Sequence, residues 1–159
     1  MDINGHNNLV EIYKNTVAII GAGISGLALG IILNKQNIKS VIFEKSSSVS
    51  EYGAGISISK NGQYVLSELD ILDNLKIISG NPQKAVFFSG SKKITSIESN
   101  VVTTSRKSLY DLLLNKYLDT GGKVCFNHEL INVNNSTKKI SFKNGSSYEV
   151  NHIAACDWH

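Results

Sequence analysis

The sequence predicts an α/β fold built on a parallel β-sheet. Three successive patterns predict it: a continuous apolar run, a glycine-rich turn directly after it, and a helical segment that leads to a second apolar run. A strand buried on both faces of a parallel sheet has such a continuous apolar sequence. Strand, helix and strand together take about thirty residues here, which is the usual size of one βαβ unit.

The elements of this unit can be placed in order. Residues 16–20 are β-branched or apolar and predict the first strand, and residues 24–35 carry apolar side chains at helical spacing. Residues 40–44 form the second apolar run and end in an acidic residue. Residues 1–15 are polar, so we expect a tail there and one domain over residues 16–159.

Strand and helix patterns follow in the rest of the sequence. Residues 61–70 and 105–118 have helical spacing, and Gly121-Gly122 ends the second of these helices. Three strands are expected to form an antiparallel meander beside the parallel sheet: 85–88, 93–97 and 101–104. Further strands are expected at 56–58, 123–127, 130–134, 139–143, 147–150 and 152–156, with a hairpin turn at Asn144-Gly145.

Composition excludes several classes of function. The 159 residues carry a net charge of +3 that is spread along the chain, so no nucleic-acid-binding surface is expected. No apolar stretch is long enough to span a bilayer. The two cysteines, Cys125 and Cys156, have no C-x-x-C spacing and form no metal-ligand pattern with the histidines. We therefore expect a cytoplasmic protein with no transmembrane segment and no metal.

The glycine-rich turn reads Gly21-Ala22-Gly23-Ile24-Ser25-Gly26, a G-x-G-x-x-G fingerprint between a predicted strand and a predicted helix. In this fingerprint the first glycine permits a tight turn, the second lets the backbone approach a pyrophosphate, and the third allows close packing of helix on strand. The backbone N–H groups and the positive end of the helix dipole then attract phosphate groups. The pattern predicts a dinucleotide-binding, Rossmann-like unit, with Gly21, Ala22, Gly23, Ser25 and Gly26 at the cofactor.

Glu44 indicates which dinucleotide is bound. It ends the second predicted strand about 20 residues after the turn, where a carboxylate accepts hydrogen bonds from the ribose hydroxyls of the adenosine. A carboxylate would repel a 2′-phosphate, so the site is not built for NADP. NAD and FAD share the adenosine diphosphate half, and both remain open on these residues alone.

The chain resembles the FAD-dependent aromatic-ring hydroxylases, the flavin monooxygenases of the p-hydroxybenzoate hydroxylase and salicylate hydroxylase type. The resemblance extends over residues 16–157 and is carried by residues 21–30, Glu44-Lys45, residues 53–59 with Asn61 and Leu66, and Arg106 ahead of Leu109 and Leu112-Leu113.

The resemblance assigns further cofactor-binding residues. It implies that FAD binds in an extended form with Lys45 beside the adenosine and Gly55 in a segment that passes close to the cofactor. It implies that Arg106 contacts the flavin cofactor, and a guanidinium can offset negative charge there with two hydrogen bonds. The family carries an Asp-Gly pair after a later strand; Asp157 matches the aspartate, whereas Trp158 stands in place of the glycine.

For a complete enzyme, the resemblance implies that NADH or NADPH reduces the flavin and that O₂ then hydroxylates an aromatic or similar organic substrate. The family's later Gly-Asp motif and its substrate-binding sheet have no counterpart in these residues, so we expect an incomplete FAD-binding domain. No residue is assigned a catalytic role. Two alternatives remain open: a non-catalytic FAD- or ADP-binding fragment, and a small NAD-dependent reductase.

Overall fold

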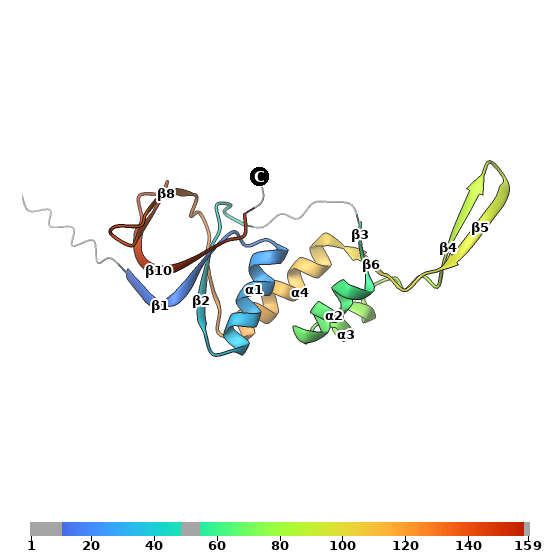
Figure 1. Cartoon of the computed structure of the whole chain (residues 1–159), viewed down its shortest axis with the longest axis horizontal. Helices are drawn as coiled ribbons and strands as arrows, with labels where there is room; N and C mark the ends of the chain where they lie inside the picture. The colour runs from blue at the N-terminus through green and yellow to red at the C-terminus, as the bar shows by residue number, and fades with distance from the viewer. Residues whose placement is uncertain (1–10, 49–54, 158–159) are drawn as a thin grey trace, which may run out of the picture. The chain divides into compact units, whose positions relative to one another are not determined.

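The computed structural model describes residues 11–48 and 55–157. The chain forms two compact units. The first unit combines residues 1–49 with residues 120–159, and the second consists of residues 50–119. The first unit is therefore discontinuous in sequence, and the second is inserted into it. Figure 1 labels the elements of both units except β7 and β9.

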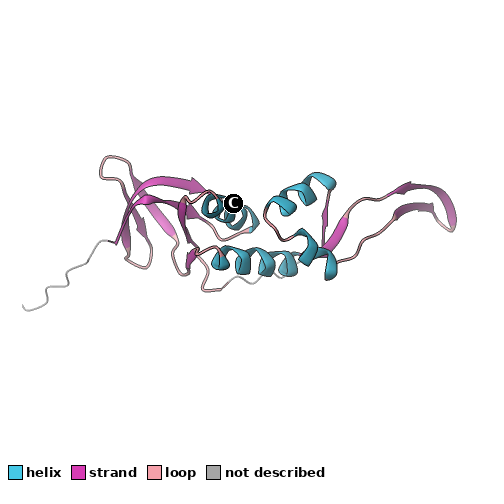
Figure 2. Ribbon diagram, turned by 90° about the horizontal axis from the view of Figure 1, so that it is seen from below, coloured by secondary structure: helices cyan, strands magenta, loops and turns pink. Residues whose placement is uncertain are grey.

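The first unit is built on a sheet with the strand order β7-β2-β1-β10-β9-β8, which has six strands among the described residues. The strands β7, β2, β1 and β10 are parallel to one another, and β9 and β8 continue the sheet antiparallel to β10. Figure 2 shows these strands in magenta. Their bounds are β1 (Glu11–Ile20), β2 (Lys39–Phe43), β7 (Lys123–Cys125), β8 (Leu130–Asn134), β9 (Lys139–Phe142) and β10 (Ser147–Ala155).

Helix α1 (Ile24–Lys35) connects the parallel neighbours β1 and β2 and contacts both strands. It buries Leu27 and Ile31 completely. Because side chains alternate along a strand, Ile19 and Ile42 lie on the opposite face of their strands from the neighbouring core residues Ala18 and Phe43. The bounds of α1 confirm the helix predicted for residues 24–35.

The core of the sheet holds a cluster of buried residues contributed by parallel and antiparallel strands alike. Phe43 and Phe142 stack with ring centroids 4.7 Å apart, and Tyr148 lies 5.1 Å from Phe43. His128 joins these rings and accepts or donates a hydrogen bond of 3.0 Å between its Nε2 and the Tyr148 hydroxyl. The cluster comprises Ala18, Ile20, Val41, Phe43, Ile140, Phe142 and Val150, with Tyr13, Cys125, Leu130 and Tyr148 packed against it.

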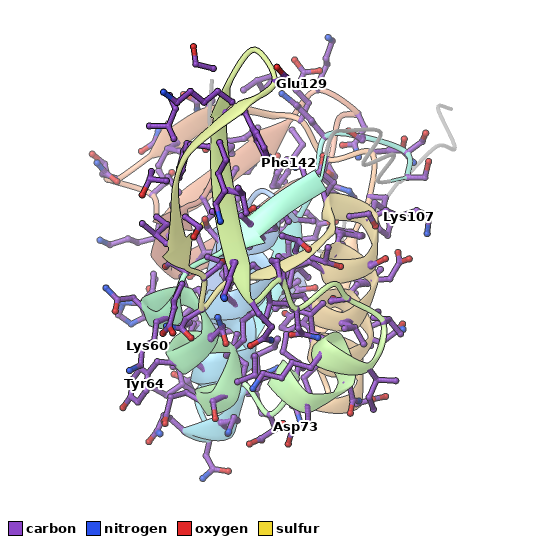
Figure 3. All side chains as sticks on the ribbon, turned by 90° about the vertical axis from the view of Figure 1, so that its right-hand side faces the viewer. Lys60, Tyr64, Asp73, Lys107, Glu129 and Phe142 are labelled. Carbon is purple, nitrogen blue, oxygen red and sulfur yellow. The ribbon has the colours of Figure 1, made fainter. Side chains whose placement is uncertain are left out.

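The second unit contains three helices among its described residues and two separate two-stranded sheets. The strands β3 and β6 pair antiparallel, and β4 and β5 form a hairpin. Leu69 and Leu75 are fully buried in this unit, whereas Tyr64 is 68% exposed on α2, one turn after Lys60 (Figure 3). The bounds are β3 (Gly55–Ile58), α2 (Lys60–Glu68), α3 (Leu72–Ile77), β4 (Lys84–Ser89), β5 (Lys92–Glu98), β6 (Val102–Ser105) and α4 (Arg106–Asp119).

The structure differs from the sequence prediction in its strand pairing. Residues 85–104 do not form one meander: β4 and β5 pair with each other, but β6 pairs with β3. The meander of successive antiparallel strands is instead β8-β9-β10, at the edge of the parallel sheet. Strand pairing depends on contacts distant in sequence, which an apolar alternation does not specify.

Element boundaries also differ in several places. The first strand begins at Glu11 rather than at residue 16, with a bulge between Tyr13 and Val17 that interrupts its pairing with β10. The expected strands 147–150 and 152–156 are one continuous strand, β10. A short helix, α3, follows α2 and was not expected. None of the described helices is both long enough and apolar enough to cross a membrane.

Candidate dinucleotide-binding site

The glycine turn lies between β1 and α1, at the carboxyl ends of the parallel strands. Gly21 has a φ of 104°, a conformation that L side chains rarely adopt, and its N–H donates to the Phe43 carbonyl at 2.8 Å. A Cβ atom at Gly21 would lie 3.0 Å from backbone atoms of Cys156 and Asp157. Glycine is required here both by the backbone angle and by the chain that follows β10.

Gly23 and Gly26 have opposite surroundings. A Cβ atom at Gly26 would lie 2.0 Å from the Gly21 carbonyl oxygen, so this glycine permits the close approach of α1 to the turn. Among the residues that the structure describes, apart from its chain neighbours and the backbone of its own helix, nothing lies within 4 Å of where a Cβ atom at Gly23 would be. The fold itself therefore does not require a glycine at position 23. The open space above Gly23 is what a ligand that approaches the backbone needs.

The first turn of α1 presents backbone N–H groups next to this open space. Gly23 is the N-cap residue, no side chain caps the helix, and its first turn contains no acidic residue. The first N–H groups of a helix have no carbonyl one turn earlier to which they can donate. Together with the helix dipole, they favour an anion at this position. Ser25 is exposed in the same turn.

Glu44 is held in place beside the turn by two backbone hydrogen bonds. Its Oε2 accepts the N–H of Ala22 at 2.8 Å, and its Oε1 accepts the N–H of Ser46 at 2.9 Å. The residue is only 9% exposed. An ionised carboxylate has about four lone-pair sites, so both oxygens can still accept a ribose hydroxyl. The Ala22 N–H is directed at Glu44, so this residue orients the carboxylate.

The backbone around Glu44 is fixed by the neighbouring strand β7. The Glu44 N–H donates to the Cys125 carbonyl at 2.9 Å, and the His128 N–H donates to the Glu44 carbonyl at 2.8 Å. Sequence reasoning did not identify Ser46, Cys125 or His128 as supports of Glu44. Cys125 on β7 and His128 just after it follow the inserted unit in the sequence, and no local pattern in the sequence indicates that β7 lies next to β2.

The remaining predicted residues of the first unit are Lys45 and Asp157, and both are exposed. Lys45 directly follows Glu44, and Asp157 has its backbone against Gly21. The Cys156 N–H donates to the Ile20 carbonyl at 2.8 Å, which keeps the end of β10 beside the turn. The structure thus brings together eight predicted residues from three places in the sequence. They are Gly21, Ala22, Gly23, Ser25 and Gly26 in the turn, Glu44 and Lys45 after β2, and Asp157 after β10. Trp158 lies outside the described residues.

Cys156 lies next to the glycine turn as well. Its Cβ is 3.4 Å from the position that a Cβ atom on Gly26 would occupy. Partial burial, and secondarily the negative charge of Asp157, raise the pKa of the Cys156 thiol above its ordinary value of 9.0. Cys156 is therefore a neutral thiol at physiological pH.

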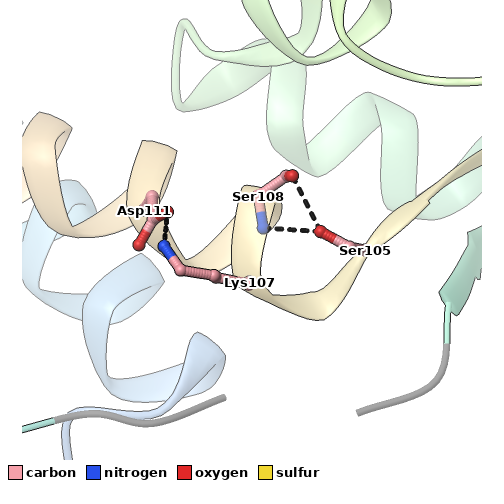
Figure 4. Close-up of polar contacts among 4 residues, drawn as sticks. All are labelled: Ser105, Lys107, Ser108 and Asp111. Carbon is pink, nitrogen blue, oxygen red and sulfur yellow. Dashed lines mark hydrogen bonds and ion pairs between the residues drawn. The ribbon is translucent and has the colours of Figure 1, made fainter. Parts of the chain in front are cut away.

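The second unit carries the other two predicted residues, Gly55 and Arg106. Gly55 pairs with Ser105 in the β3–β6 ladder, so it is a neighbour of the residue before Arg106. Arg106 is the first residue of α4. Ser105 caps this helix, because its Oγ accepts the Ser108 N–H at 3.0 Å, and Lys107 forms an ion pair with Asp111 (Figure 4).

A hollow of about 620 Å³ in the first unit is separate from this site. It lies at the amino ends of β2 and β7, whereas the glycine turn lies at the carboxyl ends of the parallel strands. Its polar side chains bond to one another: the Ser40 hydroxyl donates to Asn34 Oδ1 at 3.0 Å, and Asn34 Nδ2 donates to Thr120 Oγ1 at 3.2 Å. Among the residues that the structure describes, no group of acidic, histidine and cysteine side chains could hold a metal ion.

Comparisons with known proteins agree with this geometry. The NAD(P)-binding Rossmann-like domain family matches residues 19–67. "Monooxygenase 1" of Arabidopsis thaliana is 29% identical over 149 residues, and "3-hydroxybenzoate 6-hydroxylase 1" of Aquipseudomonas alcaligenes is 31% identical over 85 residues. The tetrameric form of 2-methyl-3-hydroxypyridine-5-carboxylic acid oxygenase superposes with a TM-score of 0.79 at 25% identity. By sequence and by fold, the chain is related to the flavin-dependent monooxygenases of the aromatic-hydroxylase type.

The chain matches only part of each of these monooxygenases. The match covers 89% of this chain but 37% of the Arabidopsis protein, and 52% of this chain but 22% of the Aquipseudomonas hydroxylase. For the solved oxygenase, it covers 89% of this chain and 38% of the other. The p-nitrophenol 4-monooxygenase of Pseudomonas putida is 16% identical and superposes with a TM-score of 0.82. It shares the fold over 92% of this chain and 41% of the monooxygenase chain.

Proposed function

We propose that this chain binds FAD and forms the cofactor-binding portion of a flavin-dependent monooxygenase. The observation that carries the proposal is the open space at Gly23, next to uncapped N–H groups of α1 and to the oriented carboxylate of Glu44. A relative from Aspergillus terreus, 41% identical over 61 residues, is named an FAD-dependent monooxygenase, which supports FAD rather than NAD as the dinucleotide.

The residues of the turn have separate tasks in this proposal. The N–H groups at the start of α1 hold the pyrophosphate, and the Glu44 carboxylate accepts hydrogen bonds from the adenosine ribose. Lys45 lies beside the adenosine. The roles of Gly55, Arg106 and Asp157 rest on the resemblance to the family, in which the matching positions contact the cofactor.

In the complete enzyme, bound FAD supplies the chemistry that uses NADH or NADPH and O₂ to hydroxylate an aromatic or similar small organic substrate. The contribution of this chain is to bind and orient the cofactor. A cytoplasmic location belongs to the same proposal, because Cys125 and Cys156 form no disulfide with each other and a reducing compartment keeps thiols reduced.

Binding is tested by titrating the purified chain with FAD and with ADP and following flavin fluorescence and heat. We expect FAD and ADP to compete for one site. Gly23→Val fills the space that the pyrophosphate needs and should remove detectable binding of both ligands. Circular dichroism should show an unchanged fold, because a side chain at this position has open space.

A matched control is Ser136→Val, which changes an exposed residue of the same unit and should leave affinity unchanged. Unaltered FAD affinity in Gly23→Val would refute the site. Binding of NAD in preference to FAD would favour the alternative of an NAD-dependent reductase. Oxidation of NADH or NADPH by the FAD-loaded chain measures activity separately, and a background rate would favour a chain that binds FAD without catalysis.

A further inference from the structure

The side chain of His128 forms hydrogen bonds through both of its ring nitrogens. Its Nδ1 lies 2.6 Å from the Phe126 carbonyl oxygen, and its Nε2 lies 3.0 Å from the Tyr148 hydroxyl oxygen. The half-buried ring packs against the rings of Phe43 and Phe142, with centroid distances of 5.5 and 5.0 Å. Hydrogen bonds at both nitrogens and aromatic rings around the imidazole together fix its orientation.

These contacts select one tautomer of the neutral imidazole ring. A carbonyl oxygen only accepts hydrogen bonds, so the Nδ1 that faces Phe126 carries the proton and donates. The Nε2 of the same neutral ring then carries no proton and accepts a hydrogen bond from the Tyr148 hydroxyl. The hydrogen bonds therefore run in one direction, from Tyr148 on β10 through the His128 ring to the backbone at Phe126.

The backbone that His128 holds is a turn that supports the Glu44 carboxylate. Asn127, between Phe126 and His128, has a φ of 58°, a left-handed conformation that persists only with support from its surroundings. The Asn127 N–H donates to the Ser46 carbonyl at 3.0 Å, and the next N–H, that of His128, donates to the Glu44 carbonyl at 2.8 Å. Ser46 donates its own N–H to the Glu44 carboxylate. A displacement of the turn therefore moves both the backbone and the side chain of Glu44.

We propose that His128 is a positioning residue for Glu44 and acts through the hydrogen bond from its Nδ1 to the Phe126 carbonyl. This hydrogen bond closes the turn around Asn127, the turn holds Ser46, and Ser46 orients the carboxylate toward the nucleotide ribose. All of these residues belong to the first unit. The inference rests on the proposed function, because the position of Glu44 affects affinity only if a ribose binds there.

Two nucleotides distinguish this role from a general effect on stability. ADP carries the ribose hydroxyls that donate to Glu44, whereas 2′,3′-dideoxy-ADP lacks them and keeps the pyrophosphate. In calorimetric titrations of the whole chain, the wild type should prefer ADP by about tenfold, and Glu44→Ala should remove this preference. His128→Phe keeps an aromatic ring in the core but has neither nitrogen. It should reduce the preference for ADP to about twofold and leave the affinity for dideoxy-ADP unchanged.

His128→Asn is the conservative variant that should restore the preference. Its side-chain amide nitrogen lies close to the position of Nδ1 and can donate to the Phe126 carbonyl, although the side chain is too short to replace Nε2. Tyr13→Phe is the matched control, because it removes from the same aromatic cluster a hydroxyl group that accepts from Lys123. Both variants should prefer ADP as strongly as the wild type does.

Nitrogen NMR of the histidine-labelled chain tests the tautomer without a ligand. At mildly alkaline pH, His128 should have a protonated Nδ1 and an unprotonated Nε2, and the opposite pattern would overturn the inference. This measurement on the wild type does not depend on whether a variant folds.

The titrations separate failure of this inference from failure of the proposed function. A wild type that does not bind ADP, or binds it no better than dideoxy-ADP, would refute the role of Glu44 and this inference with it. A preference that Glu44→Ala removes and His128→Phe leaves intact would overturn the inference alone. An equal loss of affinity for both nucleotides in His128→Phe would do the same, as would a folded His128→Asn variant without the preference.

Discussion

At the scale of single residues, the three glycines of the turn differ in what they do. Gly21 and Gly26 are required by the fold. Gly21 has a positive φ, and a side chain at Gly26 would collide with the Gly21 carbonyl oxygen. Gly23 serves the ligand, because the fold leaves open space around it. The fingerprint in the sequence treats the three alike, and only the structure separates these roles.

This separation predicts that Gly26→Ala acts on stability. The added methyl group would lie 2.0 Å from the Gly21 oxygen, so helix and turn must move apart. We expect the free energy of unfolding to fall by about 1–3 kcal/mol, as overpacking usually costs. Urea denaturation followed by circular dichroism measures it. Gly23→Ala is the control and should unfold like the wild type; equal losses in the two variants would contradict the distinction.

Cys156 provides a prediction about pH. Partial burial and the Asp157 carboxylate raise the pKa of its thiol above 9.0. Because the pKa of this thiol is raised in the folded state, its contribution to the free energy of unfolding is fully present below pH 9.0. That contribution is lost as the pH rises through the folded-state pKa. Only the thiolate reacts rapidly with iodoacetamide. The rate of alkylation of Cys156 should therefore rise with a midpoint above pH 9.0.

The variant Asp157→Asn tests the cause of this shift. Removing the carboxylate should lower the pKa of Cys156 and speed its alkylation at pH 8. The acceleration should be smaller than the one that unfolding in urea produces, because partial burial is the larger cause of the raised pKa. Mass spectrometry of the peptide that contains residue 156 gives the rate. A midpoint below pH 9.0 in the folded wild type would contradict the prediction.

At the scale of elements, helix α4 depends on the capping residue before it. The Ser105 hydroxyl oxygen accepts the Ser108 N–H at 3.0 Å, and the two hydroxyl groups are 2.7 Å apart. Ser105→Ala removes the acceptor and should cost about 1 kcal/mol of stability. Ser108→Ala keeps the backbone N–H and removes only the contact between the hydroxyls, so it should cost less. The two unfolding midpoints in urea provide the measurement, and an equal cost would show that the cap contributes nothing.

Elements were predictable where their signals are local. The bounds of α1 follow from the glycine turn before it and from apolar spacing within it, and the hairpin turn at Asn144-Gly145 agrees with the pairing of β9 and β10. The pairing of β6 with β3 was not predictable, because its two strands are separated by two helices and a hairpin. The same limit applies to the carbonyl of Cys125, which holds Glu44 from a strand beyond the inserted unit.

At the scale of the whole molecule, the division into two units was also not predictable from the sequence. Residues 120–159 return to the sheet begun by β1 and β2, and nothing in their composition distinguishes them from the residues of the inserted unit. The candidate site reflects this organisation. The glycine turn, Glu44 and Asp157 belong to the discontinuous unit, so these residues come together only when β10 has paired with β1.

The two units predict separate responses to core mutations. Leu27 in α1 and Leu75 in α3 are both fully buried, each in a different unit. Leu→Ala at either position should cost about 2–5 kcal/mol of local stability. Because each unit has its own buried residues, Leu75→Ala should speed amide hydrogen exchange in residues 55–119 and leave β1, β2 and β10 protected. Leu27→Ala should have the reverse effect, which hydrogen-exchange mass spectrometry resolves by peptide. If either variant accelerates exchange equally in both sets of peptides, the units unfold as one, and the stability of the glycine turn then depends on the inserted unit as well as on its own sheet.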